Sequence, residues 1–430
     1  MHISSTTPEY DVLIVGARVA GASLALLLAQ RGCRVMLIDR DEFPSDTIST
    51  HYLGPYAVDL VRNLGVLEDV ETTGFRRITR SRTWVSDCLL EGPIAPGDGY
   101  ALAPRRDAFD SILIEHGTRH GVEFRERTRL DSLIEHDGRV VGAVIVPRGG
   151  SPTEVRASVV VGADGRHSKV ADLVAAARYN ETPGLRPVCF GYFQGLEPLP
   201  ETAVELFFQD DRIAFVFPMQ PGADCLALEY QTDDFAAFRE DPLAALRQCF
   251  ERLPGMTARL SGATLEGRML GMRSIDNFFR VPFGPGWALI GDAGYLKDPI
   301  TGMGMGDAMT QAFWLADALR DTFEGADWDT RMAAFQQQRD ESSAPRLEFT
   351  LAAARMRDMP EESLAWLRAA LSNPFAGRFS AHTLPAMLPD AYPEIARPMV
   401  AFAAEAFGAP RPEPAIAAAD DDRSELLIHA

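Results

Sequence analysis

The sequence predicts an α/β fold, in which a first unit built on a parallel sheet is joined to a second, sheet-based domain and a helical C-terminal region. Two observations support this prediction. Residues 11–15 (DVLIV) form a short, almost wholly apolar run typical of a buried parallel strand, and a helix-forming stretch and a second apolar strand follow within about 30 residues, as in a βαβ unit. Between residues 179 and 281 the apolar runs become rich in aromatic residues, as in VCFGYFQG and IAFVFPM, which is typical of a separate sheet.

The remaining elements follow in order. Helices are predicted where helix-forming residues run on to a plausible stop, at residues 20–31, 55–63, 106–119, 234–252 and from 306 onward. Three segments alternate apolar and polar residues between turn-forming sequences, which predicts an antiparallel meander over residues 128–135, 139–147 and 153–162. The end of the chain is rich in Pro, Ala and Asp and is predicted to be disordered.

The charge and the cysteine content exclude several classes of function. The net charge is -19 and no basic stripe is present, so neither nucleic acid nor a membrane is an expected partner. Of the 42 positively charged residues only Lys169 and Lys297 are lysines. The five cysteines form no C-x-x-C pair, so no metal site or disulfide framework is expected, and a cytoplasmic location fits best. The apolar run at 12–29 is interrupted by Arg18 and lacks a basic flank, which argues against a signal peptide or membrane helix.

The stretch DVLIVGARVAG resembles a strand that runs into a phosphate-binding turn. In the G-x-G-x-x-G pattern its three slots hold Gly16, Arg18 and Gly21, so the middle glycine is an arginine. Asp39 ends the second strand, where a carboxylate can accept hydrogen bonds from ribose hydroxyls. The alternative is an ordinary strand–helix–strand unit with chance glycines. The expected dinucleotide-binding residues are Gly16, Arg18, Val19, Ala20, Gly21, Asp39 and Arg40. We expect the Arg18 guanidinium to reach back to a pyrophosphate oxygen.

Two further motifs lie downstream in the chain. They are GADGRHS at 162–168 and GWALIGDAGYLKDPITGMGMGDA at 286–308. With GARVAG and LIDR before them, they resemble the signatures of the FAD-dependent aromatic hydroxylases, the p-hydroxybenzoate hydroxylase-like group, and of their geranylgeranyl reductase-like relatives. The resemblance covers about residues 10–345. It implies that FAD is the cofactor and that NAD(P)H is a co-substrate.

This resemblance divides the chain into three parts. The first is a Rossmann-like, discontinuous FAD-binding domain, formed by residues 1–75, 100–178 and 282–345. The second is a substrate domain with a mixed or antiparallel β-sheet, formed by residues 76–99 and 179–281. The third is the helical C-terminal region with its tail, residues 346–430.

The second motif contains Asp164 and Gly165, which the resemblance places near FAD and links with NAD(P)H. The alternative is a simple Asx-turn. The family pattern has an arginine three residues after the serine, and that position here is Ala171, which weakens the link with NAD(P)H.

The third motif implies contacts with the flavin half of FAD. In the family its aspartate contacts the ribityl chain, its proline lies beside the flavin ring, and its glycines make room for the ring at a helix N-terminus, whose positive end stabilises charge on the reduced flavin. The corresponding positions are Gly291, Asp292, Pro299, Gly302, Met303, Gly304 and Met305. The chain departs from the family at Tyr295, where histidine is common, and at Gly306, where asparagine is usual.

Two more cofactor contacts follow from the resemblance. Arg106 opens an R-x-x-F-D-x-x-L helix whose arginine approaches FAD, and Leu130 matches a position that contacts the adenine end through its backbone. A solvent-facing Arg106 and a competing role for Arg105 are the alternatives.

The candidate catalytic residues are His51, in a loop that passes the flavin in related enzymes, and Tyr295. A histidine can exchange protons near neutral pH, although a lone histidine more often caps or packs. Five strand side chains recur at period two and either line a substrate pocket or form core: Phe190, Tyr192, Phe215, Phe217 and Met219.

The resemblance implies an FAD-dependent monooxygenase that hydroxylates an aromatic or polyketide-like small molecule with NAD(P)H and molecular oxygen, through a flavin C4a-hydroperoxide, as a monomer or homodimer. Two alternatives are an FAD-dependent reductase of prenyl-type double bonds and a non-redox flavin-binding scaffold or cyclase. Flavin-dependent halogenation is set aside, because the family's halogenases use a lysine before the substrate domain and a W-x-W-x-I-P segment. Here the first lysine is Lys169 and no such segment occurs.

Overall fold

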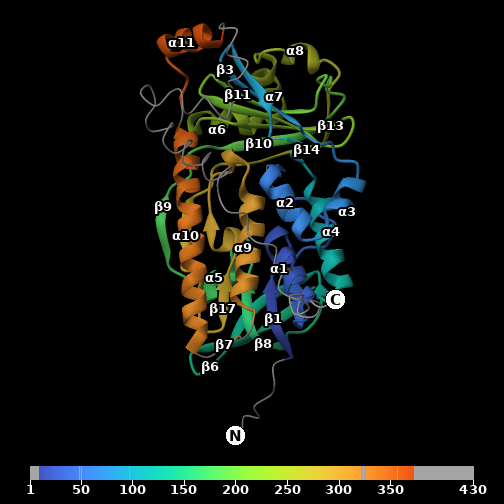
Figure 1. Cartoon of the computed structure of the whole chain (residues 1–430), viewed down its shortest axis with the longest axis vertical. Helices are drawn as coiled ribbons and strands as arrows, with labels where there is room; N and C mark the ends of the chain where they lie inside the picture. The colour runs from blue at the N-terminus through green and yellow to red at the C-terminus, as the bar shows by residue number, and fades with distance from the viewer. Residues whose placement is uncertain are drawn as a thin grey trace, which may run out of the picture.

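The computed structural model describes residues 9–371, apart from residues 48, 50, 96, 321, 322, 324, 325 and 356. It confirms the predicted α/β class. A largely parallel sheet with its helices forms the lower part of the molecule in Figure 1, and a second sheet lies above it along the long axis. The tail that the sequence predicts to be disordered lies outside the described residues.

The first sheet has a parallel centre. Its strands, in spatial order, are β16 (Phe283–Gly284), β17 (Trp287–Leu289), β8 (Thr153–Gly162), β1 (Tyr10–Val15), β2 (Val35–Ile38) and β5 (Glu123–Arg125). All neighbours from β17 to β5 are parallel, and β16 pairs antiparallel with β17. The predicted meander is confirmed, because β6 (Thr128–His136) and β7 (Arg139–Pro147) pair antiparallel and β7 pairs antiparallel with β8.

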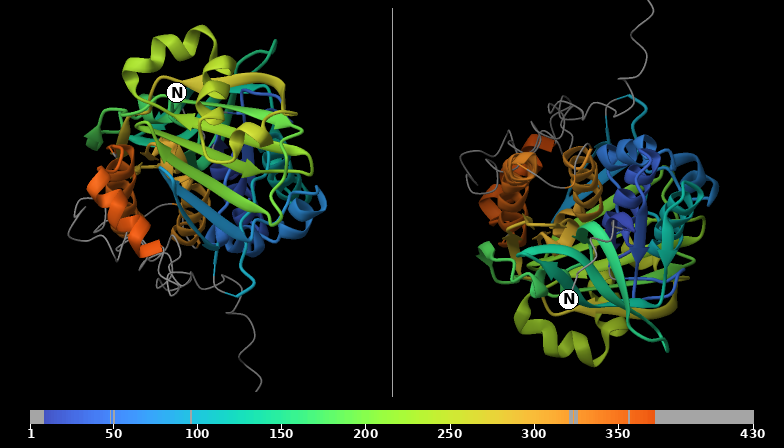
Figure 2. Two further views of the ribbon diagram at one scale, coloured as in Figure 1. Left: turned by 90° about the horizontal axis from the view of Figure 1, so that it is seen from above. Right: turned by 90° about the horizontal axis from the view of Figure 1, so that it is seen from below.

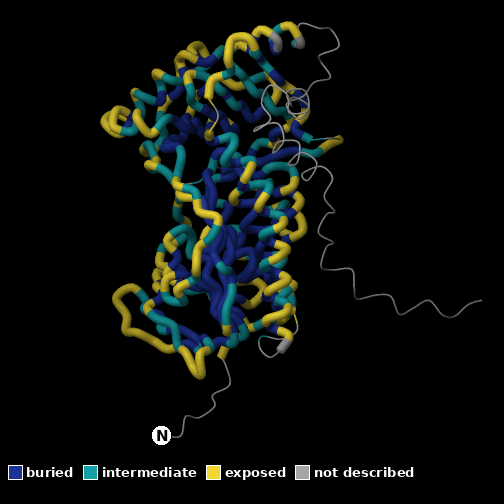
Figure 3. Tube along the Cα trace, turned by 90° about the vertical axis from the view of Figure 1, so that its left-hand side faces the viewer, coloured by how far each residue is buried: buried dark blue, intermediate teal, exposed yellow. Residues whose placement is uncertain are grey.

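Both faces of this sheet are buried, which explains why its strands are apolar throughout. Val12 and Ile14 of β1 pack with helices on one face, whereas Leu13 and Val15 pack with the meander on the other. The helices on the first face are α1 (Val19–Gln30), α2 (Pro55–Asn63), α3 (Leu67–Thr72), α4 (Arg106–Arg119) and α9 (Gly304–Ala318), while α5 (Lys169–Leu173) packs beside β6 and β8. In Figure 3 the buried residues form a continuous dark-blue column along this part of the molecule.

The second sheet is antiparallel except for one parallel pair, between β11 and β3. Its strands, in spatial order, are β14 (Thr264–Met272), β10 (Val188–Gln194), β13 (Ala223–Glu229), β12 (Arg212–Pro218), β11 (Ala203–Gln209), β3 (Arg80–Val85) and β4 (Cys88–Pro93). One face packs against the helices that lie over the sheet in the view from above (Figure 2), and the other turns toward the first sheet. The helices are η1 (Thr232–Asp234), α6 (Phe235–Glu240), α7 (Pro242–Glu251) and α8 (Met256–Arg259).

The single helix predicted over 234–252 is wrong in one respect, because it breaks at Asp241. This residue has φ -141° and ψ 85°, and its side chain accepts a hydrogen bond from Ala244 N at 3.0 Å. Pro242 disfavours helical backbone at the residue before it, so the chain ends α6 and starts α7 with a new cap.

A small third sheet and two C-terminal helices complete the described chain. The sheet contains β18 (Tyr295–Leu296), β15 (Asn277–Arg280) and β9 (Arg178–Thr182). The third motif continues through η2 (Gly291–Ala293) and η3 (Pro299–Thr301). Helix α10 (Ala326–Arg355) packs against α9 and η3, and α11 (Glu361–Leu371) packs against β4. The C-terminal region is therefore helical as far as it is described.

Candidate functional site

The first glycine motif forms a tight strand-to-helix turn. Gly16 has a φ of 105°, and a Cβ added to it would lie 2.4 Å from the carbonyl oxygen of Ala163. A Cβ on Gly21 would lie 1.8 Å from the carbonyl oxygen of Gly16. Neither position accepts a side chain, because β1, the start of α1 and the second motif approach one another too closely.

The third motif meets the first at Gly291, which has a φ of 59°. A Cβ there would lie 2.9 Å from the Cβ of Ala20 and 3.8 Å from the Cβ of Ala308. Gly291 is thus wedged between the first turns of α1 and α9. The three glycine motifs, far apart in the sequence, converge on one place, and two helix N-termini meet there. Such N-termini bind anionic groups such as phosphate.

Asp292 faces an open space at this convergence. Its side chain is exposed although Gly291 and Ala293 on either side are buried. The surrounding protein nevertheless raises the pKa of this carboxyl by desolvation, an effect that the positive charges of Arg106 and Lys297 oppose. Gly304, at the start of α9, is exposed as well, and within the described part of the chain a Cβ added to it would meet no atom within 4 Å beyond its chain neighbours and its own helix. Glycines, helix N-termini and an accessible carboxyl fit a phosphate-containing cofactor.

Asp39 shapes the turn at the other end of this region. Its Oδ2 accepts a hydrogen bond from Ala17 N at 2.7 Å and its Oδ1 accepts one from Asp41 N at 2.8 Å. Burial raises the pKa of this carboxyl. Each oxygen keeps a second lone pair with which it can accept a hydrogen bond from a ribose. Arg40 is exposed at the end of β2, and Leu130 is buried on the meander side of the sheet.

Arg18 is held by protein groups. Its Nη1 donates to Asp110 Oδ2 at 3.1 Å and to Ser45 O at 2.6 Å, and its guanidinium lies 4.8 Å from the centre of the Phe43 ring. Arg106 donates to the same buried carboxylate through Nε and Nη2, both at 3.1 Å. Asp110 therefore joins Arg18, before α1, to Arg106, at the start of α4. The contact of Arg18 with a pyrophosphate stays a prediction.

The carboxylate of the second motif is occupied by a helix cap. Asp164 Oδ2 accepts hydrogen bonds from Lys169 N at 2.6 Å and Val170 N at 3.2 Å, and Oδ1 accepts one from the Ser168 hydroxyl. These bonds favour the turn interpretation of Asp164 itself. The adjacent Gly165 has a φ of 77° and open space around it, so its backbone remains accessible to a ligand.

The turn that contains Pro299 and Gly302 lies against an aromatic ring. Gly302 has a φ of 66°, and a Cβ on it would lie 3.3 Å from Tyr52 Cδ1. The Tyr52 ring lies 5.9 Å from that of Phe217 on the second sheet. Pro299 is half-buried, Met303 precedes α9 and Met305 is buried. Tyr52 thus links the predicted flavin turn to the aromatic face of the second sheet.

The five period-two side chains of the second sheet lie on this same face. Phe190, Tyr192, Phe215, Phe217 and Met219 are all buried in one cluster that includes Ile300 of η3. Their position between the second sheet and η3 suits either core or pocket. A substrate pocket among them stays a prediction.

The two candidate catalytic side chains are both turned into the protein. His51 is fully buried, its Nε2 lies 2.8 Å from the Tyr192 hydroxyl and its Nδ1 lies 3.3 Å from Pro104 O. Burial lowers its pKa to about 4. Tyr295 stacks on Phe279 with ring centres 4.5 Å apart and donates to Ser343 O of α10. This geometry favours positioning over direct contact with a substrate for both residues.

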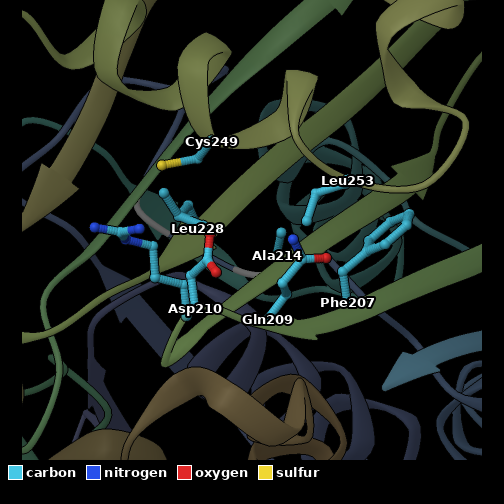
Figure 4. A pocket seen from close by; sticks show the side chains of 8 residues that line it. Phe207, Gln209, Asp210, Ala214, Leu228, Cys249 and Leu253 are labelled. Carbon is cyan, nitrogen blue, oxygen red and sulfur yellow. The ribbon is translucent and has the colours of Figure 1, made fainter. Parts of the chain in front are cut away.

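A separate small cavity lies on the opposite face of the second sheet. It is lined by Phe207, Gln209, Asp210, Arg212, Ala214, Leu228, Cys249 and Leu253 (Figure 4). Its volume of about 10 Å³ holds about one water molecule. It is too small for an organic substrate and lies away from the glycine motifs.

The structure adds polar groups that the sequence alone did not single out. Asp110 could have been found, because its i, i+4 spacing from Arg106 places both on one helix face. Buried Lys297 pairs with Asp307, whose Oδ1 accepts a second bond from Arg346 Nη1 at 2.7 Å. The rarity of lysine, of which Lys297 is one of two in the chain, was the only signal for this cluster.

Comparison with known proteins identifies the family. A family model described as an FAD binding domain matches residues 9–350. The chain belongs to this FAD-binding family. It is therefore an FAD-binding flavoprotein of an oxidoreductase family, as the three glycine motifs predict. The resemblance to aromatic hydroxylases and geranylgeranyl reductases is confirmed by relatives of both kinds.

Three curated relatives show the chemical range of the family. The chain is 29% identical over 342 residues to a 1H-pyrrole-2-carbonyl-[peptidyl-carrier protein] brominase of Pseudoalteromonas luteoviolacea, covering 76% of this chain and 81% of the relative. It is 27% identical to a digeranylgeranylglycerophospholipid reductase of Methanosarcina acetivorans, covering 70% and 72%. A 6-methylpretetramide 4-monooxygenase of Streptomyces rimosus is 32% identical, covering 38% and 40%.

Solved structures agree on the fold. The flavin-dependent brominase Bmp2 has a TM-score of 0.73 at 22% identity, covering 91% of this chain and 93% of its own. PqsL, a probable FAD-dependent monooxygenase from Pseudomonas aeruginosa, has a TM-score of 0.71 at 24% identity, covering 84% and 99%. Among the described residues, none of the helices is long and apolar enough to cross a membrane.

Proposed function

We propose that this chain is an FAD-dependent monooxygenase that uses NAD(P)H and O₂ to oxygenate an aromatic or polyketide-like small molecule, as a cytoplasmic monomer or homodimer. The observation that carries the proposal is the placement of the turn at Gly302. It lies between the convergence of the glycine motifs on one side and the aromatic face of the second sheet on the other, with Tyr52 bridging the two. This arrangement would bring a flavin ring and an apolar substrate together.

Residues of the first and third motifs would hold FAD. The backbone around Gly16 and Gly21 would hold the pyrophosphate, Asp39 the ribose, and Asp292 the ribityl chain. The turn from Pro299 to Gly304 would face the flavin ring. Bound FAD would supply the electron transfer from NAD(P)H and the activation of O₂.

The surrounding protein would position the substrate and keep water out. Phe190, Phe215 and Phe217 belong to a buried apolar cluster, and a pocket beside them would suit an aromatic ring and exclude solvent from the site. The N-terminus of α9 would stabilise negative charge on the cofactor. The same features suit phenols and fused-ring polyketides better than charged substrates. One relative, a 6-methylpretetramide 4-monooxygenase, acts by its name on 6-methylpretetramide.

Halogenation is the second candidate, because a brominase matches most of this chain. The sequence argues against it. The halogenase chemistry implied by the family uses a lysine before the substrate domain, and residues 1–168 contain none. Lys297, the other lysine, is buried and paired with Asp307. Reduction of prenyl-type double bonds is the third candidate, and the archaeal reductase supports it.

One set of assays separates these candidates. The purified protein is reconstituted with FAD, and oxidation of NADH and NADPH is followed against phenols and polyketides under ¹⁸O₂, with bromide or chloride present in parallel reactions. Product carrying ¹⁸O supports the proposal. A halogenated product would replace the proposal by halogenation, and a product hydrogenated without O₂ would replace it by reduction of a double bond. If no substrate stimulates NAD(P)H oxidation, a non-redox flavin scaffold replaces it.

A further inference from the structure

Two buried carboxyl groups meet between the second sheet and the predicted flavin turn. Asp298 directly precedes Pro299, and Glu229 ends β13. The exposed fraction is 0% for Asp298 and 1% for Glu229. Neither residue is among the cofactor contacts expected from the three motifs. Burying a charged group costs free energy unless the charge is paired, so two buried carboxyl groups side by side need a physical explanation.

Asp298 is fixed by backbone contacts. Its Oδ1 accepts a hydrogen bond from Ile300 N at 3.1 Å, which caps η3, and its own N–H donates to Asn277 Oδ1 at 2.7 Å. Its other oxygen, Oδ2, and Glu229 Oε2 are both buried and receive no hydrogen bond from a donor among the described residues. The two carboxyl groups are close enough to hydrogen-bond each other. That bond needs a proton on one of them, because two carboxylates only accept.

The charges around the pair favour a single negative charge. Arg186 is buried nearby and acts electrostatically on both carboxyls. Its guanidinium donates to Ala354 O of α10 and to Asp211 O, each at 2.7 Å. Arg357 and Asp211 are the other charged groups that act on Arg186, and their effects oppose each other. Two ionised carboxylates beside one arginine would leave a net negative charge in the protein interior, whereas one proton makes the cluster neutral.

We propose that Glu229 and Asp298 share one proton, and that this protonated pair docks the turn of residues 298–302 onto the second sheet. The pair is a positioning device for the turn that the proposed function places against the flavin. Its link with FAD rests on that proposed function, whereas the shared proton itself does not.

The proton also sets the direction of the pH dependence. Burial raises the pKa of Glu229 well above its usual range and that of Asp298 to about 6. For a carboxyl with a raised folded-state pKa, stability is fully present below the unfolded-state pKa, near 4. It is lost as the pH rises through the folded-state values. The loss reaches about tenfold in the folding equilibrium constant per pH unit for each proton retained.

The test uses full-length, FAD-reconstituted protein and the variants Glu229→Gln, Asp298→Asn and their combination. An amide donates the hydrogen bond that otherwise needs the shared proton. Each single variant is therefore expected to become more stable than wild type as the pH rises from 5 to 8, and the double variant to gain little beyond either single one. FAD affinity should weaken with rising pH in wild type and stay level in the single variants.

A matched control comes from the same sheet. Glu205 is as buried as Glu229 but accepts hydrogen bonds from Arg82 and Arg259. Glu205→Gln removes a paired charge and is expected to destabilise the protein across this pH range. This effect on stability is opposite to that expected for Glu229→Gln and Asp298→Asn.

Infrared spectroscopy measures the proton directly. Wild type should show a protonated carboxyl band at pH 7 that either single variant abolishes, so one folded variant is enough for the comparison. Two ionised carboxylates at pH 7, or single variants whose effects simply add, would overturn the shared proton. If the protein does not bind FAD, the proposed function fails, while the infrared and stability results still decide the shared proton.

Discussion

The Arg18 guanidinium donates a hydrogen bond to the buried carboxylate of Asp110 at 3.1 Å, and Asp110 also binds Arg106. One carboxylate thus ties the turn before α1 to the start of α4, at the place where the middle glycine of the motif is missing. Replacing that glycine with arginine therefore adds a contact within the protein, instead of simply damaging the turn.

Asp110→Asn should destabilise the protein by about 3 kcal/mol, because it leaves two partly buried arginines without their shared counter-ion. Urea unfolding of wild type and variant at pH 7 measures this difference. Asp107→Asn on the same helix is the control. Its carboxyl is 37% exposed and 4.0 Å from Arg105, so a change within about 0.5 kcal/mol is expected. Equal losses in the two variants would contradict the bridging role of Asp110.

Gly304→Ala should leave stability nearly unchanged and weaken FAD binding at least tenfold. Apart from its chain neighbours and its own helix, no described residue has an atom within 4 Å of the added Cβ, which would therefore project toward the proposed flavin position. Fluorescence titration with FAD measures the affinity. Gly306→Ala on the same helix is the control, because its Cβ would meet Ala57 of α2 at 3.4 Å, an ordinary contact, instead of this space. Unchanged FAD affinity in Gly304→Ala would exclude the assigned flavin position.

The elements with local signals were predictable from the sequence. Helices α2 and α4 begin and end at the predicted residues, because Pro55 marks the first turn of α2 and the apolar residues of α4 recur at helical spacing. The break at Asp241 was missed, although Pro242 signals it, since the apolar pattern continues across it.

The contacts between distant segments were not predictable. Gly291 lies between α1 and α9, and Glu229 meets Asp298, only because the two sheets pack in one particular way. Composition and periodicity carry no information about such pairings. The motifs indicated that FAD binds and that Asp164 lies near the site, but only the structure showed that its carboxylate caps α5.

Asp307→Asn should destabilise the protein by about 3 kcal/mol, because buried Lys297 and half-buried Arg346 both lose the carboxylate that pairs with them. Lys297→Met should cost less than about 1.5 kcal/mol, since the Asp307–Arg346 pair remains and the apolar side chain fills the same space. Thermal unfolding at pH 7 gives both values. A larger loss for Lys297→Met than for Asp307→Asn would show that Lys297, not Asp307, is the centre of this cluster.

The pH dependence of stability should report on His51. Its folded-state pKa of about 4 lies below the ordinary value of 6.5, so the unfolded chain binds the proton more tightly. Stability is then lost as the pH falls from 6.5 to 4, by at most about 3 kcal/mol. His51→Asn should remove this part of the profile, and asparagine tolerates the backbone φ of 56° at this position. Urea unfolding at several pH values measures both proteins, with exposed His136→Gln as the control. If wild type and His51→Asn lose stability in parallel below pH 6.5, the imidazole is not buried in the neutral form, and a direct acid–base role for His51 becomes the better explanation.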